Sequence, residues 1–132
     1  MSGLRLFATD SEDLSVLSTL IQDAIMAAGD ARYDAGRREV AMLMSRFRWE
    51  ADGAPTRVRS CLLARGVLGA ARARWPQDGT PLVVLAVTGE EGRVRIDFAG
   101  GAAVRLRTEC LDLTLEDLGE PWAVRHRPAH RA

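Results

Sequence analysis

The spacing of apolar residues changes once along this chain, and that change constrains the fold more than any other feature. Between residues 10 and 29, apolar side chains recur every three or four positions, at Leu14, Leu17, Ile21, Ala24, Ile25 and Ala28. This stripe predicts an amphipathic helix that begins at a cap from Asp10 or Ser11 and ends at Gly29. After Gly29 the apolar residues alternate with a period of two, which predicts strands.

Turn-forming residues divide the rest of the chain into segments with strand-like alternation. Candidate strands include residues 4–8, 38–49, 57–65, 82–88, 93–98 and 102–110. Residues 111–118 are interpreted as a last strand that runs into a short helix. We therefore predict an α+β fold, with one N-terminal helix packed on a twisted antiparallel sheet of about six strands. We expect the sheet to curl toward a half-barrel, and a closed barrel plugged by the helix is the alternative.

The length and the two ends of the chain bound its organisation. The 132 residues fit one domain, and we assign residues 1–120 to it and residues 121–132 to a basic C-terminal tail. The longest apolar run, Leu82–Val87, is too short to span a membrane, and the N-terminus lacks the apolar core of a signal peptide. We therefore expect a cytoplasmic protein in which Cys61 and Cys110 are reduced, buried thiols.

Composition and missing motifs argue against several function classes. The formal net charge is zero, so no overall field draws the chain to nucleic acid or to a membrane. Every basic side chain is Arg, and the lack of Lys excludes a Gly-x-x-x-x-Gly-Lys-Ser/Thr phosphate loop. The Gly-x-Ser-x-Gly and His-Glu-x-x-His patterns are also missing. We therefore predict no catalytic residue, no cofactor, no metal ligand and no membrane partner, and we favour a binding protein over an enzyme.

A hairpin predicted over residues 93–110 allows an argument about strand register. Its loop, Ala99-Gly100-Gly101, places Gly101 where a three-residue loop needs a left-handed residue. In that register Ile96 lies opposite Val104, and Val94 lies opposite Leu106, which gives one apolar face. A two-residue loop would mix apolar and charged side chains on both faces, so we expect the three-residue form.

The other face of this hairpin is expected to gather four arginines: Arg93, Arg95, Arg105 and Arg107. Directly opposed like charges destabilise a sheet by about a few tenths of a kcal/mol per pair. Guanidinium groups also suit carboxylates and phosphates. We therefore predict that this surface contacts a protein partner or an anionic ligand. The alternating pairs Arg57/Arg59 and Arg72/Arg74 are candidates to extend it.

Several alternatives stay open for these residues. The same arginines could hold the phosphates of a nucleic acid, although the chain has few aromatic residues to stack on bases. The surface could also be an ordinary solvated face that is neutralised by nearby acids, namely Glu90, Glu91, Asp97 and Glu109. Arg125 and Arg127 of the tail are second candidates for partner contact. A small enzyme with an unrecognised pocket near Cys61 or Cys110 is the third function class.

Short strings along nearly the whole chain carry a resemblance to a known family. They include Leu4-Arg-Leu, Gln22-Asp23-Ala24, Arg46-Phe47-Arg48-Trp49-Glu50, Glu109-Cys110-Leu111 and Arg127-Pro128-Ala129-His130. Together they resemble a small family of uncharacterised proteins from alphaproteobacteria, a domain of unknown function. The resemblance implies a bacterial cytoplasmic protein. The family has no assigned activity, so the resemblance carries no catalytic residue to this chain.

Overall fold

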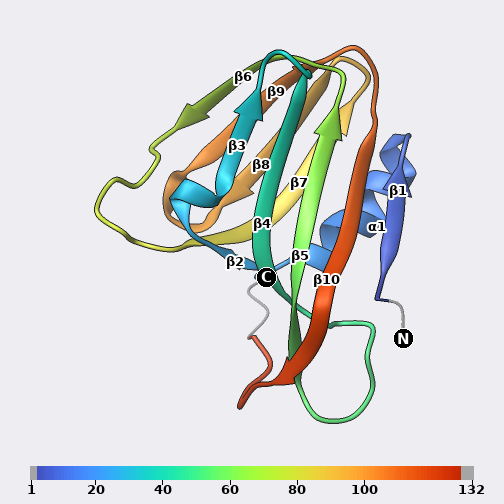
Figure 1. Ribbon diagram of the computed structural model, residues 1–132, viewed down its shortest axis with the longest axis vertical. Coiled ribbons are helices and arrows are strands. Elements are labelled where there is room, and N and C mark those ends of the chain that lie inside the picture. The colour runs from blue at the N-terminus through green and yellow to red at the C-terminus, as the bar shows by residue number, and fades with distance from the viewer. Residues whose placement is uncertain (1–2, 129–132) are drawn as a thin grey trace.

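One α-helix packs on a ten-stranded antiparallel sheet in the computed structural model, which describes residues 3–128 (Figure 1). The elements in chain order are β1 (Arg5–Ala8), α1 (Ser11–Ile21), β2 (Ile25–Met26), β3 (Ala31–Asp34), β4 (Glu39–Phe47), β5 (Thr56–Arg65), β6 (Val67–Ala73), β7 (Leu82–Glu90), β8 (Arg93–Phe98), β9 (Ala103–Thr108) and β10 (Leu113–Ala123). Short 3-10 turns cover Ala28–Asp30 and Ala99–Gly101. The predicted combination of one N-terminal helix and an antiparallel sheet is confirmed, but the sheet has more strands than the roughly six expected.

The helix α1 begins where the sequence predicts and ends earlier. The carboxylate of Asp10 accepts a hydrogen bond from the backbone N–H of Asp13 at 2.7 Å, which caps the first turn. The predicted end at Gly29 is wrong, because Ile21 is the last helical residue. Beyond it, the backbone N–H of Asp23 donates to the Val84 carbonyl at 2.8 Å, and the Ala24 carbonyl accepts from the Val84 N–H at 2.8 Å. Pairing with β7 therefore overrides the helical periodicity of residues 24–28.

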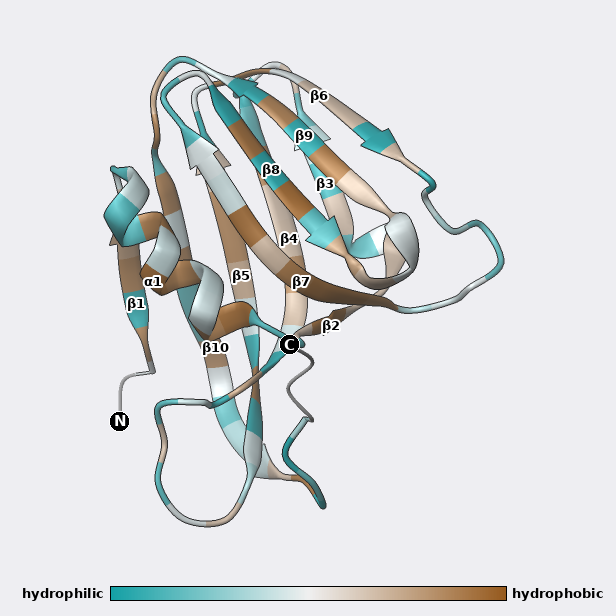
Figure 2. Cartoon of the chain, turned by 180° about the vertical axis from the view of Figure 1, so that it is seen from behind, coloured by the Kyte–Doolittle hydropathy of each residue, from teal (hydrophilic) through white to brown (hydrophobic). Residues whose placement is uncertain are grey.

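The sheet is bent so that two layers of strands face each other across the core. The strand order is β1-β10-β5-β4-β2-β7-β8-β9-β6, with β3 paired to β4 off this path. Figures 1 and 2 show β4, β5 and β10 on one side and β7, β8 and β9 on the other. The core draws on both layers, with Met42 and Leu62 from one and Val84 and Ile96 from the other. The sheet is not closed, so the alternative of a closed barrel is wrong.

The helix lies between β1 and β7, which belong to different layers, and contributes side chains to the core. Leu14, Leu17 and Ile21 are fully buried, and α1 packs against β7, β1 and β4 (Figure 2). Each buried aliphatic side chain of this size contributes roughly 1.5–3 kcal/mol to folding. The helix therefore holds the two layers together. No helix within residues 3–128 is long and apolar enough to cross a membrane.

The last strand differs from the prediction in its length and its end. The segment after Leu111 was expected to turn into a short helix, but β10 continues as a strand from Leu113 to Ala123. It pairs with β5 over this length, with an irregularity between Leu118 and Trp122 that contains Gly119 at φ 78°. The strand therefore extends past residue 120, where we placed the end of the domain, into the first residues of the segment assigned to the tail. Pairing with β5 gives the backbone N–H and C=O groups of β10 hydrogen-bond partners, whereas the ends of a short helix would leave several of these groups to solvent.

Candidate functional site

The β8–β9 hairpin has the register predicted from the sequence. Arg95 pairs with Arg105 and Arg93 with Arg107, while Val94 lies opposite Leu106. The backbone N–H of Phe98 donates to the Ala102 carbonyl at 2.9 Å and closes the loop. Both loop glycines have positive φ, 85° at Gly100 and 94° at Gly101. This backbone is costly for other residues, so the glycines fix the loop length and therefore the register.

The two faces of the hairpin are sharply divided by burial. Val94, Ile96 and Leu106 point into the core and are nearly inaccessible to solvent. The alternation of hydrophobic and hydrophilic residues along β8 and β9 is visible in Figure 2. The exposed side carries Arg93, Arg95, Arg105 and Arg107, which we call the arginine face.

Most of the arginine face lacks neutralising partners. Arg95 donates from Nε to an Asp97 carboxylate oxygen at 2.8 Å, and Arg107 donates to the Leu68 carbonyl at 3.3 Å. Within residues 3–128, no carboxylate lies within ion-pair distance of Arg93, Arg105 or Arg107. The alternative of a face neutralised by local acids therefore holds only for Arg95.

The acids expected to neutralise the face are mostly engaged elsewhere or too far away. Glu109 pairs with Arg38 instead. Glu90 lies opposite Arg93 in the register of β7 and β8, yet the two do not form an ion pair. The face is therefore a local excess of positive charge on a chain whose formal net charge is zero.

Small side chains lie beside the arginine face on β6. Gly69 pairs with Arg107 and Ala71 pairs with Arg105, so both lie on the same side of the sheet as the arginines. Two shallow hollows of about 460 and 420 Å³ flank the face, and both include Arg93 and Arg105 in their lining. The guanidinium groups of Arg93 and Arg105 are therefore accessible from the direction of β6 as well as from the direction of β7.

Neither of the pairs expected to extend the arginine face does so. Arg74 follows the last residue of β6, and its side chain lies beside Gly101 in the β8–β9 loop. Arg72 lies opposite Val104, whose side chain is buried, so Arg72 is on the other side of β6 from the arginine face. The bulge between Val67 and Gly69 shifts the pairing by one residue, and this shift determines which β6 side chains point to each side of the sheet. Arg59 lies on β5, in the opposite layer, where it forms an ion pair with Asp30 at 3.7 Å. Burial lowers the pKa of Arg57, which donates to the Ser45 carbonyl at 2.9 Å.

The tail arginines lie away from the arginine face. Arg127 stacks over the ring of Phe47 in β4, with 5.4 Å between its Cζ and the ring centroid. The N–H of Val124 donates to the Pro55 carbonyl at 3.0 Å, which holds the start of the tail against the loop before β5. Arg125 is exposed. His130, the second histidine of the tail, lies outside the described residues. A partner contact by Arg125 and Arg127 stays a prediction.

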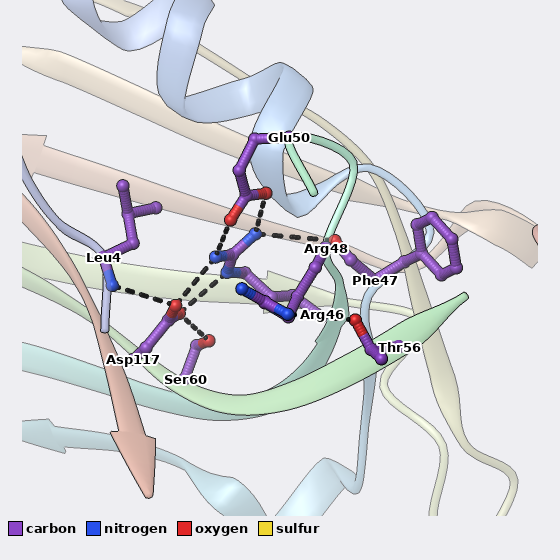
Figure 3. A network of polar contacts seen from close by, with 8 residues as sticks. All are labelled: Leu4, Arg46, Phe47, Arg48, Glu50, Thr56, Ser60 and Asp117. Carbon is purple, nitrogen blue, oxygen red and sulfur yellow. Dashed lines mark hydrogen bonds and ion pairs between the residues drawn. The ribbon is translucent and has the colours of Figure 1, made fainter. Parts of the chain in front are cut away.

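A second charged cluster, which was not predicted from the sequence, is centred on a buried arginine between β4, β5 and β10, and one of its two carboxylates, Glu50, is partly exposed (Figure 3). The side chain of Arg46 is completely inaccessible. It donates two hydrogen bonds to Asp117 at 2.8 Å each and two to Glu50 at 2.9 and 2.7 Å. A longer contact of 3.5 Å reaches the Phe47 carbonyl. These bonds use every N–H donor that a guanidinium group offers. We call these three charged residues the buried cluster.

The buried cluster also ties in neutral groups from other segments. Asp117 accepts from the Ser60 hydroxyl at 2.7 Å and from the backbone N–H of Leu4 at 3.1 Å (Figure 3). The cluster therefore connects the N-terminal segment, β4, β5 and β10. Because its donors and acceptors are paired internally, its chemistry suits a structural clamp better than a ligand site.

The electrostatics of the buried cluster favour its charged state. Hydrogen bonds from Arg46 lower the pKa of Glu50 against the opposing effect of burial. Burial would raise the pKa of Asp117, but hydrogen bonds from Arg46 and Ser60 outweigh it, so the net shift is downward. Burial would likewise lower the pKa of Arg46, and its bonds to the two carboxylates reverse the shift. All three groups are therefore ionised at neutral pH.

A signal for the buried cluster was present in the sequence. Val40, Met42 and Met44 are buried on one side of β4, and Arg46 continues the same period of two. A charged residue in phase with a buried apolar series indicates a paired, buried charge. The partners could not be found in the same way, because Asp117 lies 71 positions away in sequence.

A family model described as "Protein of unknown function (DUF2948)" matches residues 4–130. The chain belongs to this family. Neither the curated proteins nor the solved structures gave a match. The family assignment confirms the resemblance seen in the sequence, and it assigns no activity to the arginine face or to the buried cluster.

The cysteines of this family member depart from the expectation of two buried thiols. Cys110 is exposed, and Cys61 is half-buried with a pKa that burial raises. Neither thiol lines the hollows beside the arginine face. Among residues 3–128, no three Asp, Glu, His or Cys side chains come together as metal ligands would.

Proposed function

We propose that this chain is a non-enzymatic binding domain whose arginine face holds an acidic segment of a partner protein. The observation that supports it is the hairpin register, which gathers four guanidinium groups while leaving three of them without a carboxylate partner among the described residues. Such groups offer charge-assisted, bidentate hydrogen bonds to incoming carboxylates. The bacterial, cytoplasmic setting expected from the sequence is part of the same proposal.

The spacing of the arginines suits an extended acidic peptide. Residues directly opposite each other across an antiparallel pair lie about 5 Å apart. Residues two positions apart on one strand lie about 7 Å apart. An extended peptide repeats its own side chains at the same interval of about 7 Å on each face. Asp or Glu at alternate positions would therefore meet Arg93 and Arg95 on one strand, or Arg105 and Arg107 on the other.

Two features favour a protein partner over a nucleic acid. The residues that flank the arginine face in register are Gly69, Ala71, Thr88 and Glu90, and none of these four is aromatic. Single-stranded nucleic acids usually gain much of their binding from stacking on exposed rings. The carboxylate of Glu90 would repel a phosphate backbone, whereas a peptide can place a basic or neutral residue beside it.

The test is binding of a labelled peptide with Glu at alternate positions, measured by fluorescence anisotropy at low and at physiological salt. The variant replaces Arg93, Arg95, Arg105 and Arg107 with Ser. We expect it to lose at least about tenfold in affinity, because several charge-assisted hydrogen bonds are removed together. The control replaces four exposed arginines elsewhere, Arg5, Arg37, Arg38 and Arg59, with Ser. It has the same net charge as the variant, and we expect less than about a threefold loss.

Two outcomes would contradict the proposal. Equal losses in the two fourfold variants would show that only overall charge matters. Tighter binding of DNA or RNA than of the peptide, with a steep dependence on salt, would favour the nucleic-acid alternative. If the peptide binds as expected, capture from lysate by wild type and by the variant, each with nuclease, would identify the natural partner.

A further inference from the structure

Two of the free edges of the sheet, those of β3 and β6, meet at a seam. Within residues 3–128, β6 is the last strand of the order and pairs only with β9, while β3 pairs only with β4. The strands are joined at one end, where the N–H of Val67 donates to the Arg38 carbonyl at 2.8 Å. At the other end, the indole N–H of Trp75 donates to the Ala28 carbonyl at 3.2 Å. Between these two bonds the sheet stays open (Figure 1).

A cavity of about 240 Å³ occupies this opening. Its floor contains Val40, Met42 and Val104, all of which belong to the apolar core. The exposed Arg72 and the half-buried Trp75 also line it, and Arg72 shares the Val104 side of β6. Arg32 lines the cavity from β3, but it pairs with Ala41 and therefore lies on the other side of β3 from Val40 and Met42. Trp75 is held by two ring contacts, an edge-to-face contact with Phe98 at 5.5 Å and a cation–π contact with Arg72 at 5.6 Å. The site is therefore an apolar hollow with a positively charged rim.

The charges at this rim are not neutralised by the protein. Among the described residues that line the cavity, none is acidic. Within residues 3–128, neither Arg32 nor Arg72 forms an ion pair. An apolar floor favours a hydrocarbon group, and the unpaired guanidinium group of Arg72 favours an anionic group at its end.

We propose that the seam cavity binds a small amphiphilic carboxylate, with its hydrocarbon chain on the floor and its carboxylate at Arg72. The volume lies just below the range of about 300–1,000 Å³ typical of sites for drug-sized ligands, which indicates a short chain rather than a long-chain lipid. This site is separate from the arginine face and goes beyond the function proposed above, because Arg72 lies on the opposite side of β6.

Octanoate is the probe, because it is a short-chain carboxylate that does not form micelles at the concentrations required. The chain has three tryptophans, and their indole N–H signals in ¹H–¹⁵N NMR spectra can be assigned by single Trp→Phe variants. We expect octanoate to shift the Trp75 signal in a saturable way and to leave the Trp122 signal in place. Trp122 is exposed on β10, away from the seam.

Matched variants and ligands test each part of the proposal. Arg72→Ser should weaken octanoate binding about tenfold, because it removes a charged hydrogen bond. Ala70→Leu fills the cavity from β6 and should weaken it at least as much. Arg5→Ser, on the far edge strand β1, should leave the affinity within about twofold. Octanol, which has the same chain without the charge, should bind at least tenfold more weakly.

Three results would overturn the proposal. The first is no shift of the Trp75 signal at millimolar octanoate. The second is equal binding of octanol and octanoate, or equal binding of octanoate by wild type and by Arg72→Ser. The third is a Trp75 signal that moves with protein concentration in the absence of octanoate, which would make the seam an interface between two copies of the chain.

Discussion

The buried cluster and the arginine face put the same side chain in opposite surroundings. Arg46 is completely inaccessible, and its hydrogen bonds to Asp117, Glu50 and the Phe47 carbonyl use all of its donors. Arg93 and Arg105 are exposed, and neither has an ion-pair partner within residues 3–128. A guanidinium group with every donor satisfied holds parts of the fold together, whereas one with free donors can recruit an anion.

This difference in surroundings shows that the role of an arginine in this protein depends on which groups its guanidinium contacts in the folded structure, and not on its neighbours in sequence. In water an exposed ion pair contributes only about 0–1 kcal/mol. A buried charge that loses its partner costs far more, because it cannot return to solvent. We therefore expect substitutions in the buried cluster to change stability, and substitutions in the arginine face to change binding.

The largest effect is expected from Arg46→Met, which keeps the apolar bulk and removes the charge. Asp117 would stay buried without its cation, and such losses cost about 3–5 kcal/mol of unfolding free energy. Urea unfolding followed by circular dichroism measures this difference. A loss below about 1 kcal/mol would mean that water or a neighbouring group replaces Arg46, and that the buried cluster is not a clamp.

A second variant separates the charge from the packing. Arg46→Met combined with Asp117→Leu removes both charges of the most buried pair. Replacing a whole buried pair with apolar residues is often neutral or stabilising. The double variant should therefore recover much of the stability that Arg46→Met loses, and failure to recover would show that the bonds from Ser60 and Leu4 matter more.

The next effect is the loss of stability in acid. The folded-state pKa values of Glu50 and Asp117 are lowered, whereas in the unfolded chain they return to about 4. Their contribution is therefore fully present above the unfolded values and is lost as pH falls through the folded values. We expect the unfolding free energy of wild type to fall more steeply below about pH 5 than that of Asp117→Asn. Parallel pH profiles would contradict this assignment.

The smallest effect is expected from the arginine face. Arg93→Ser with Arg105→Ser should change the unfolding free energy by only about a few tenths of a kcal/mol, and in the stabilising direction at low salt, since like charges are separated. Added salt should stabilise wild type more than this variant because it screens the same repulsion. A loss above about 1 kcal/mol would show that these arginines make structural contacts, and the comparison with Arg46 would fail.

Local patterns predicted the parts of the fold that depend on neighbouring residues. The helix cap was narrowed to Asp10 or Ser11 because a cap acts within one turn of the helix, and the structure selects Asp10. The register of the arginine face was found because two glycines fix the loop length, and a slip of one residue would bury charges. The corresponding inference for Arg72 was wrong, because a bulge between Val67 and Gly69 changes which β6 side chains point to which side of the sheet.

Contacts between distant segments could not be predicted in this way. The helical stripe continued past Ile21, yet Asp23 and Ala24 bond to Val84 in β7. The strand β10 was expected to become a helix, yet it finds a full partner in β5. In both cases backbone groups that a local pattern assigns to one element are satisfied by a strand far away in sequence.

The sequence by itself determined the helix start, most strand positions and the gathering of four arginines on one hairpin face, because each rests on contacts between residues that are close along the chain. Only the tertiary structure decided that Arg46 would be buried between Asp117 and Glu50, and that β3 and β6 would leave a cavity between them. Those features depend on which strands become neighbours, and the period of a single strand shows which side is buried without showing what covers it.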